Sequence, residues 1–208
     1  MEMLLLSLAL ADRTRELENL NRQLLTRQQL LEQQANHDPL TGLANRKQLQ
    51  DRLASAKTRC MEAGDSFGLA VVDLDRFKEL NDSLGHRAGD EVLVAISRRL
   101  EALLRHSDTV ARIGGDEFVL LLEGIRNRDD LACMKAKLSA IGDLPILLHD
   151  GTEVHVGLSS GVAMYPDDTS DTEDLYSLAD ADMYRDKRGR ASGQGVRGLA
   201  EHTAAAPE

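Results

Sequence analysis

Residues 110–122 read VARIGGDEFVLLL and place two adjacent glycines between two apolar runs. Tight turns of the primed types need positive φ angles, which glycine adopts freely. Gly114 and Gly115 therefore predict a β-hairpin that joins a strand over 109–113 to a strand over 117–123. By itself this pattern indicates structure and says nothing of function.

Further elements flank this hairpin on both sides. Apolar periodicity predicts helices over 45–63, 89–105, 128–141 and 173–187, and strands over 67–74 and 154–163. After the leading helix the order is β-α-β-β-α-β, which is that of a ferredoxin-like α+β core, with a further helix appended. We expect this core to form one domain over residues 37–190.

The segment before this domain, residues 1–36, has a different pattern. Its apolar residues follow a heptad seam, interrupted by Arg13 and Arg27, that comprises Met3, Leu6, Leu10, Leu17, Leu20, Leu24 and Leu31. Such a seam predicts a parallel coiled-coil stalk with a partner helix; the alternative is a helix folded back on its own domain. Pro39 and Gly42 end the pattern and mark the domain boundary. At the other end, residues 191–208 are rich in Gly, Ala and Ser and predict a disordered tail.

Length and composition limit the functions open to the chain. Its 208 residues, of which 42% are hydrophobic and 29% charged, suffice for one ordinary domain plus a smaller segment. A net charge of −10 would repel a polyphosphate backbone, and 3% aromatic residues without Trp provide no platform for stacked bases, so we expect no nucleic-acid partner. Cys60 and Cys133 fit neither a disulfide framework nor a zinc site, which favours a reducing, cytoplasmic compartment.

The first apolar run, residues 3–11, is about half as long as the roughly 20 residues that a membrane-spanning helix needs. It is therefore too short to cross a bilayer alone. A signal peptide is the rival interpretation, but Glu2 stands where such a peptide carries positive charge. Because the run could be the end of a longer span, we expect an upstream membrane or sensor module in a longer chain.

Acidic residues end the predicted strand over 67–74 and follow the hairpin glycines; they are Asp73, Asp75, Asp116 and Glu117. In the β-α-β-β-α-β order the first and third strands are central antiparallel neighbours, so the end of the first lies beside the start of the third. Two carboxylates 4 Å apart repel by about 4 kcal/mol at an effective dielectric near 20, and a divalent cation removes this cost. The convergence predicts a magnesium site; the alternative is a set of solvated turn carboxylates.

Five further segments accompany the GGDEF pentapeptide at 114–118. They are HDPLTGLANR at 37–46, DLDRFKELND at 73–82, LGHRAGDEVL at 84–93, SSGVAMYP at 159–166 and ADADMYRDK at 179–187. With these motifs the chain resembles, over residues 37–190, the GGDEF family of diguanylate cyclases. The resemblance implies a nucleotide-cyclase or polymerase-palm-like form of the ferredoxin-like fold. It also implies that a homodimer, with one GTP in each half-site, condenses two GTP into cyclic di-GMP and two pyrophosphates.

The resemblance assigns roles at the reacting end of the site. Asp73 and Asp116 match the family's metal-binding carboxylates, with the carbonyl of Leu74 as a further ligand, for Mg²⁺ or Mn²⁺. Glu117 matches the residue near the ribose and is a candidate for activating the 3′-hydroxyl that attacks the partner's α-phosphate. Lys187, at the end of the last predicted helix, would supply a cation for the phosphates.

Other matches would hold the substrate. Asn81 and Asp90 match the guanine-reading pair, and a carboxylate suits guanine because it accepts from N1 and N2 hydrogens that adenine lacks; the alternatives are that Asn81 caps a turn and Asp90 begins a helix. The backbone N–H groups of Phe77 and Lys78 match the family's phosphate cradle. Arg190 is a further expected phosphate ligand, although Lys-Arg-Gly-Arg here is one residue shorter than the family's Lys-x-x-Gly-Arg; the alternative is a basic residue that complements a helix end.

Arg105 and Asp108 form an RxxD motif at the distance before GGDEF where the family has an inhibitory site for its own product. The fork of an arginine can pair with guanine while its charge meets phosphate, so we expect cyclic di-GMP to bind there; the alternative is ordinary helix-end and turn chemistry. Two functions rival the cyclase: a catalytically silent module that senses GTP or cyclic di-GMP, and a structural dimeriser.

Overall fold

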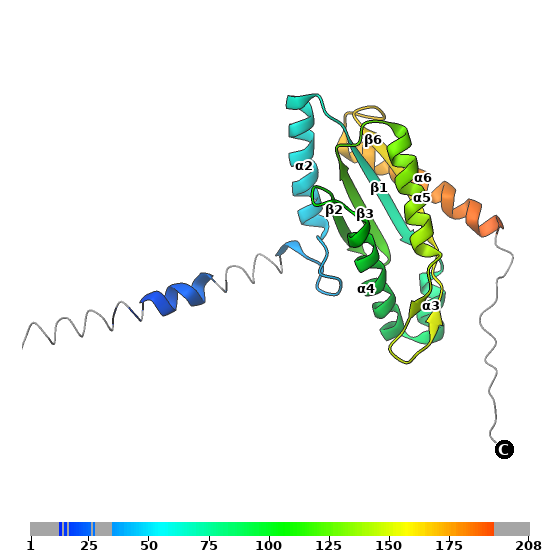
Figure 1. Ribbon diagram of the computed structural model, residues 1–208, viewed down its shortest axis with the longest axis horizontal. Coiled ribbons are helices and arrows are strands. Elements are labelled where there is room, and N and C mark those ends of the chain that lie inside the picture. The colour runs from blue at the N-terminus through cyan, green and yellow to red at the C-terminus, as the bar shows by residue number, and fades with distance from the viewer. Residues whose placement is uncertain (1–12, 14, 16, 26, 28–34, 194–208) are drawn as a thin grey trace, which may run out of the picture.

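The computed structural model describes residues 13, 15, 17–25, 27 and 35–193 (Figure 1). Helices and strands follow one another along the domain. Their bounds are α2 Arg46–Ala63, β1 Phe67–Leu74, α3 Phe77–Leu84, α4 His86–Leu103, β2 Thr109–Gly114, β3 Glu117–Glu123, α5 Arg128–Gly142, β4 Ile146–Leu147, β5 Glu153–Val154, β6 Leu158–Tyr165 and α6 Thr172–Gly193.

Four strands form one antiparallel sheet in the order β2-β3-β1-β6. The two central strands are β1 and β3, as a ferredoxin-like core requires. Helices cover both faces, with α4 and α5 on one face and α2 and α6 on the other (Figure 1). The expected α+β fold is therefore confirmed.

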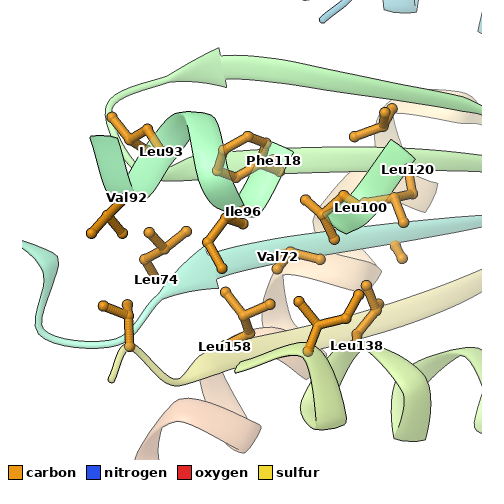
Figure 2. Close-up of a cluster of buried hydrophobic side chains, with 14 of the residues drawn as sticks. Val72, Leu74, Val92, Leu93, Ile96, Leu100, Phe118, Leu120, Leu138 and Leu158 are labelled. Carbon is orange, nitrogen blue, oxygen red and sulfur yellow. The ribbon is translucent and has the colours of Figure 1, made fainter. Parts of the chain in front are cut away.

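Alternate side chains of β1 enter two separate cores, because successive residues of a strand point to opposite faces of the sheet. Val72 and Leu74 share one cluster with Ile96 and Leu100 of α4 and with Leu138 of α5 (Figure 2). Residues 69 and 71 belong to the second cluster, which lies against α2 and α6. Since both faces are covered, β1 is almost wholly buried and its sequence is a nearly continuous apolar run.

Side-chain caps fix the starts of two helices. The side-chain oxygen of Asn45 accepts a hydrogen bond from the backbone N–H of Gln48 in α2, and that of Asn127 accepts from the N–H of Asp130 in α5. Gly64, with φ of 70°, ends α2 in the left-handed conformation that glycine allows. The bounds of α2 and α5 agree to within one residue with the helices predicted over 45–63 and 128–141.

The structure differs from the expectation after β1. Helix α3 was not predicted, because its eight residues are too few for a periodic signal. Helix α4 begins at His86 and ends at Leu103, earlier at both ends than the expected 89–105. Gly85, with φ of 84°, separates the two helices and sets the start of α4.

A second difference lies between α5 and α6. The apolar run over 154–163 is interrupted at Gly157, where an added Cβ would lie 2.5 Å from Oδ2 of Asp75. Val154 lies before this interruption and belongs to the short hairpin formed by β4 and β5. The strand β6 begins after it, at Leu158.

Helix α6 is longer than predicted. It ends at Gly193 instead of near residue 187, so residues 191–193, which the sequence assigned to a disordered tail, are helical. The helix continues past Gly189, and the guanidinium of Arg190 donates a hydrogen bond of 2.6 Å to the hydroxyl of Ser139 in α5. The remaining residues of the predicted tail, 194–208, lie outside the described residues.

The N-terminal residues that the structure describes, 13, 15, 17–25 and 27, are helical. Leu17, Leu20 and Leu24 of the heptad seam are each more than half exposed, so these side chains do not pack on the domain. The apolar run over 3–11 and the rest of the seam, Met3, Leu6, Leu10 and Leu31, lie outside the described residues, and the coiled coil stays a prediction. None of the described helices is long and apolar enough to cross a membrane.

Candidate active site

Three carboxylates gather at one edge of the sheet. Asp73, near the end of β1, is the register partner of Glu117 at the start of β3, and Asp116 precedes Glu117 in the hairpin turn. Alternation along the strands places Asp73 on the face of Val71 and Glu117 on the face of Val119, which is the face that α6 covers. The expected meeting of the first and third strands is confirmed.

Asp116 shows the electrostatic effect of this crowding, since burial and the nearby charge of Asp73 both raise the pKa of its carboxyl. Within the described part of the chain, no group of three or more His, Cys, Asp or Glu side chains is arranged to hold a metal ion. From this edge, the protein groups that would bind a metal ion are the carboxylates of Asp73 and Asp116 and the carbonyl oxygen of Leu74. These oxygen donors fit a hard divalent cation that completes its coordination with water and substrate phosphate.

Lys187 of α6 reaches the same edge. Its Nζ lies 2.5 Å from Oδ1 of Asp73. Burial opposes the charged ammonium, but the hydrogen bond to Asp73 and the charges of Asp73 and Asp116 outweigh burial and raise the pKa of Lys187. The ammonium is paired with Asp73 in this structure, and it lies where it could also meet a phosphate group that enters the site.

Tyr176 is a further α6 residue at this site, and it was missed from the sequence. Its hydroxyl donates a hydrogen bond to Oε1 of Glu117. Burial and this hydrogen bond raise the pKa of Tyr176 well above its usual value. The signal that could have found it is spacing: Tyr176 precedes Lys187 by eleven residues, or about three helical turns, so both lie on one face of α6.

Asn81 and Asp90 lie beyond the end of β1, in α3 and α4. Oδ1 of Asn81 is buried and has no hydrogen-bond partner in the described structure. A Cβ on Gly89 would lie 2.0 Å from this atom, so glycine is needed beside it. A buried amide oxygen without a partner is costly unless a ligand supplies a donor. Asp90 is exposed in the second turn of α4, so the alternative in which it begins that helix is wrong.

The backbone of Phe77 and Lys78 forms the first turn of α3, directly after the carboxylate-bearing end of β1. Arg76 at the N-cap has φ of 57° and is the single non-glycine residue with positive φ in the described part of the chain. No side chain caps this helix, and first-turn N–H groups have no partner within their own helix. The turn can therefore receive an anionic group.

Arg190 does not join the carboxylates. Its Nε donates to Oδ2 of Asp186 at 3.3 Å, and its guanidinium also donates to Oγ of Ser139 on α5 at 2.6 Å. The phosphate contact of Arg190 stays a prediction. Compared with the family's spacing, one residue fewer after Lys187 rotates the arginine by about 100° around the helix axis.

Arg112, like Tyr176, was not predicted from the sequence as part of the site. It donates to both oxygens of Asp38, at 3.0 and 3.2 Å, and to the carbonyl of Gly115, at 3.0 and 2.8 Å. Asp38 in turn accepts from the backbone N–H and the hydroxyl of Thr41. The loop before α2, which contains Asp38, is therefore tied to the turn that carries Asp116.

Arg105 and Asp108 lie at the other end of β3 from the carboxylates. Asp108 accepts from the N–H of Arg105 at 3.0 Å and, through its other oxygen, from the N–H of Glu123 at 3.1 Å. Both residues line a cavity of about 440 Å³, whose lining also includes the basic Arg126 and Lys137 and the acidic Glu123 and Asp130. The cavity has the volume of a nucleotide-sized ligand, and its basic side chains could meet the phosphates of such a ligand.

Comparison with known families decides what this arrangement belongs to. The profile of the family described as diguanylate cyclase, GGDEF domain, matches residues 35–192, which is most of the chain. The chain belongs to the GGDEF-domain family of diguanylate cyclases. The match covers every element from α2 to β6 and nearly all of α6.

Relatives of this GGDEF domain agree with the assignment. Diguanylate cyclase TpbB of Pseudomonas aeruginosa is 41% identical over 186 residues, which are 89% of this chain and 42% of TpbB. The crystal structure of the TpbB GGDEF domain has a TM-score of 0.70 at 41% identity and covers 72% of this chain and 92% of that one. The coiled coil and GGDEF domain of DgcB from Caulobacter crescentus, in complex with cyclic di-GMP, has a TM-score of 0.73 at 30% identity and covers 88% and 95%. The chain thus spans less than half the length of TpbB.

Proposed function

We propose that this GGDEF domain is a diguanylate cyclase that condenses two GTP into cyclic di-GMP and two pyrophosphates across a homodimer. The observation that carries the proposal is the meeting of Asp73 and Asp116 at one sheet edge beside Lys187. Carboxylates for a divalent cation next to a fixed ammonium are the groups that phosphoryl transfer needs.

Each of two equivalent steps forms one phosphodiester. The 3′-hydroxyl oxygen of one GTP attacks the α-phosphorus of the other, the bond from that phosphorus to the bridging oxygen breaks, and pyrophosphate leaves. Glu117 accepts the hydroxyl proton, and Lys187 meets the charge that develops on the phosphates. Mg²⁺ or Mn²⁺, held by Asp73, Asp116 and the Leu74 carbonyl, supplies Lewis acidity at the phosphates.

Polar groups on α3 and α4 would recognise the guanine base. The buried, unpartnered Oδ1 of Asn81 can accept from the guanine base, and Asp90 can accept from its N1 and N2 hydrogens. Adenine has neither donor in that position and would leave these acceptors unpaired, which is costly. The backbone of Phe77 and Lys78 receives the phosphates.

The product site and the dimer are further parts of the proposal. We expect cyclic di-GMP to bind in the cavity at Arg105 and Asp108; DgcB, a structural relative, was solved in complex with that molecule. The two half-sites meet when stalk helices pair through the exposed seam at Leu17, Leu20 and Leu24. Oligomer mass measured alongside activity, with and without residues 1–36, tests the stalk. A cytoplasmic location and an upstream sensor module are expectations that accompany this function.

The direct test incubates the purified protein with GTP and Mg²⁺ and separates the products. We expect cyclic di-GMP and pyrophosphate from the wild type, and at least a hundredfold less from Asp73→Asn and from Asp116→Asn, because each variant loses a metal ligand. Asp65→Asn, which changes an exposed carboxylate before β1, is the matched control and should retain full activity.

Two results would contradict the proposal. Near-normal turnover by both aspartate variants would exclude the metal assignment. Binding of GTP or cyclic di-GMP by the wild type without any product would favour the catalytically silent sensing module instead.

A further inference from the structure

Helix α6 provides partners for two of the three carboxylates. Lys187 donates to Asp73, and the hydroxyl of Tyr176 donates to Oε1 of Glu117. Lys187 follows Tyr176 by eleven positions, which correspond to three full turns plus about 20°, so both residues lie on one stripe of the helix. The contact of Lys187 with Asp73 is an ion pair, whereas the contact of Tyr176 with Glu117 is a hydrogen bond from an uncharged hydroxyl.

We propose that Tyr176 is a positioning residue that fixes the carboxylate of Glu117 for the attack of the 3′-hydroxyl. The inference rests on the proposed cyclase function, because Glu117 acts on the reacting atoms only in that reaction. The contact with Tyr176 involves Oε1. A carboxylate has a second oxygen, and in this arrangement Oε2 is the atom that takes the proton.

The anchoring of Tyr176 supports this role. Its neighbours in α6, Leu175 and Ala179, are fully buried, and the half-buried Tyr176 packs against the cluster on the α6 face of the sheet. The ring is thus held by a rigid element. Glu117, by contrast, has three rotatable side-chain bonds, and without a donor its carboxylate would sample several rotamers. Misplacement of a reacting group by about 1 Å can cost a hundredfold in rate.

The chemistry of a phenol also suits the task. At neutral pH the tyrosine hydroxyl is protonated and uncharged, so it orients the carboxylate without neutralising it. A lysine in the same place would form an ion pair and compete with the incoming substrate hydroxyl. Tyr176 therefore leaves Glu117 able to accept a proton.

Tyr176→Phe tests the inference, because it removes the hydroxyl and keeps the ring that packs on the sheet. We expect kcat to fall about tenfold, the size of effect that a hydrogen bond to a charged group supports. KM for GTP, calorimetric affinity for 3′-deoxy-GTP in Mg²⁺ and thermal midpoint should stay close to wild type, since packing and substrate contacts are unchanged. Tyr184→Phe removes a hydroxyl from an exposed position of the same helix and should leave all four quantities unchanged.

Each possible outcome decides the matter. A Tyr176→Phe protein with wild-type kcat would overturn the positioning role while leaving the cyclase proposal intact. Loss of affinity for 3′-deoxy-GTP, or a lowered thermal midpoint that accounts for the loss of activity, would show a structural role and overturn it too. A wild-type protein that makes no cyclic di-GMP would overturn the proposed function, and the role of Tyr176 with it.

Discussion

Asp38 links the domain boundary to the active-site turn through a single arginine. Arg112 holds the carbonyl of Gly115 with two donors and both oxygens of Asp38 with a third, and the two charged side chains are only 13% and 16% exposed. Because Gly115 immediately precedes Asp116, this pair helps to fix the turn that presents a proposed metal ligand. A largely buried pair that makes several hydrogen bonds stabilises more than a surface ion pair does.

We predict that Asp38→Asn lowers the free energy of unfolding by about 2 kcal/mol at pH 7. Burial raises the pKa of Asp38, but the hydrogen bonds from Thr41 and the pairing with Arg112 outweigh it, so the folded-state pKa lies below the ordinary value. Stability from a carboxyl with a lowered pKa is present above the unfolded pKa of about 4 and is lost as pH falls through the folded pKa. The difference between wild type and variant should therefore be constant from pH 5 to 8 and shrink below pH 4.

Thermal or urea unfolding across pH measures this difference. Asp65→Asn, at an exposed position, should show almost no difference at any of these pH values. If the difference in unfolding free energy between wild type and Asp38→Asn increased as pH falls, the ionised pairing of Asp38 with Arg112 would be contradicted.

At the scale of elements, α6 decides whether the site exists. It bears both Lys187 and Tyr176, and it lies directly on β6 at Gly161. A Cβ at Gly161 would lie 2.0 Å from the backbone N of Met183 and 2.1 Å from the carbonyl oxygen of Ala179. The helix backbone thus contacts the strand backbone, and only glycine permits this approach.

Gly161→Ala should therefore destabilise the fold by about 3 kcal/mol or more, because the backbone atoms it meets cannot move aside as a flexible side chain could. The matched control is Gly189→Ala in α6, where an added Cβ meets nothing within 4 Å. The control should be neutral or stabilise by about 0.5–1 kcal/mol, since alanine favours the helix. Denaturant unfolding of both variants checks this prediction. Equal unfolding midpoints for the two variants would show that the backbone of α6 does not contact β6 closely at Gly161.

At the scale of the whole molecule, the two proposed nucleotide sites lie at opposite ends of one strand. Glu117 begins β3, while Leu122 and Glu123 at its end line the cavity of Arg105 and Asp108. Seven residues of strand span about 20 Å, so a product in the cavity does not overlap GTP at the carboxylates.

We therefore expect cyclic di-GMP to inhibit non-competitively with GTP, and Arg105→Ala to relieve the inhibition without lowering the initial rate. Loss of a charged fork that pairs with both base and phosphate should weaken product binding at least tenfold by titration calorimetry. Arg98→Ala removes an exposed arginine of α4 outside the cavity and should bind product as the wild type does. Equal product affinity in wild type and Arg105→Ala would place the site elsewhere.

Local sequence patterns determined much of this protein. The alternation and glycine turn around residues 110–122 fix the hairpin, and capping residues such as Asn45 and Asn127 fix helix starts, because these signals act between neighbours in the chain. The strand order follows from the order of elements. That order alone predicts that the end of β1, with Asp73, lies beside the start of β3, with Glu117, and the register of the two strands confirms it.

Contacts between distant segments were decided only by the tertiary structure. The bond from Tyr176 to Glu117 spans 59 residues and that from Arg112 to Asp38 spans 74. No local pattern encodes such pairs, since each depends on how α6 or the loop before α2 packs on the sheet. The contact of Arg190 with Ser139 of α5 is a further pair of this kind, since it joins two helices that are far apart in the sequence. Spacing along a chain specifies which face a residue occupies, whereas packing between elements specifies what that face meets.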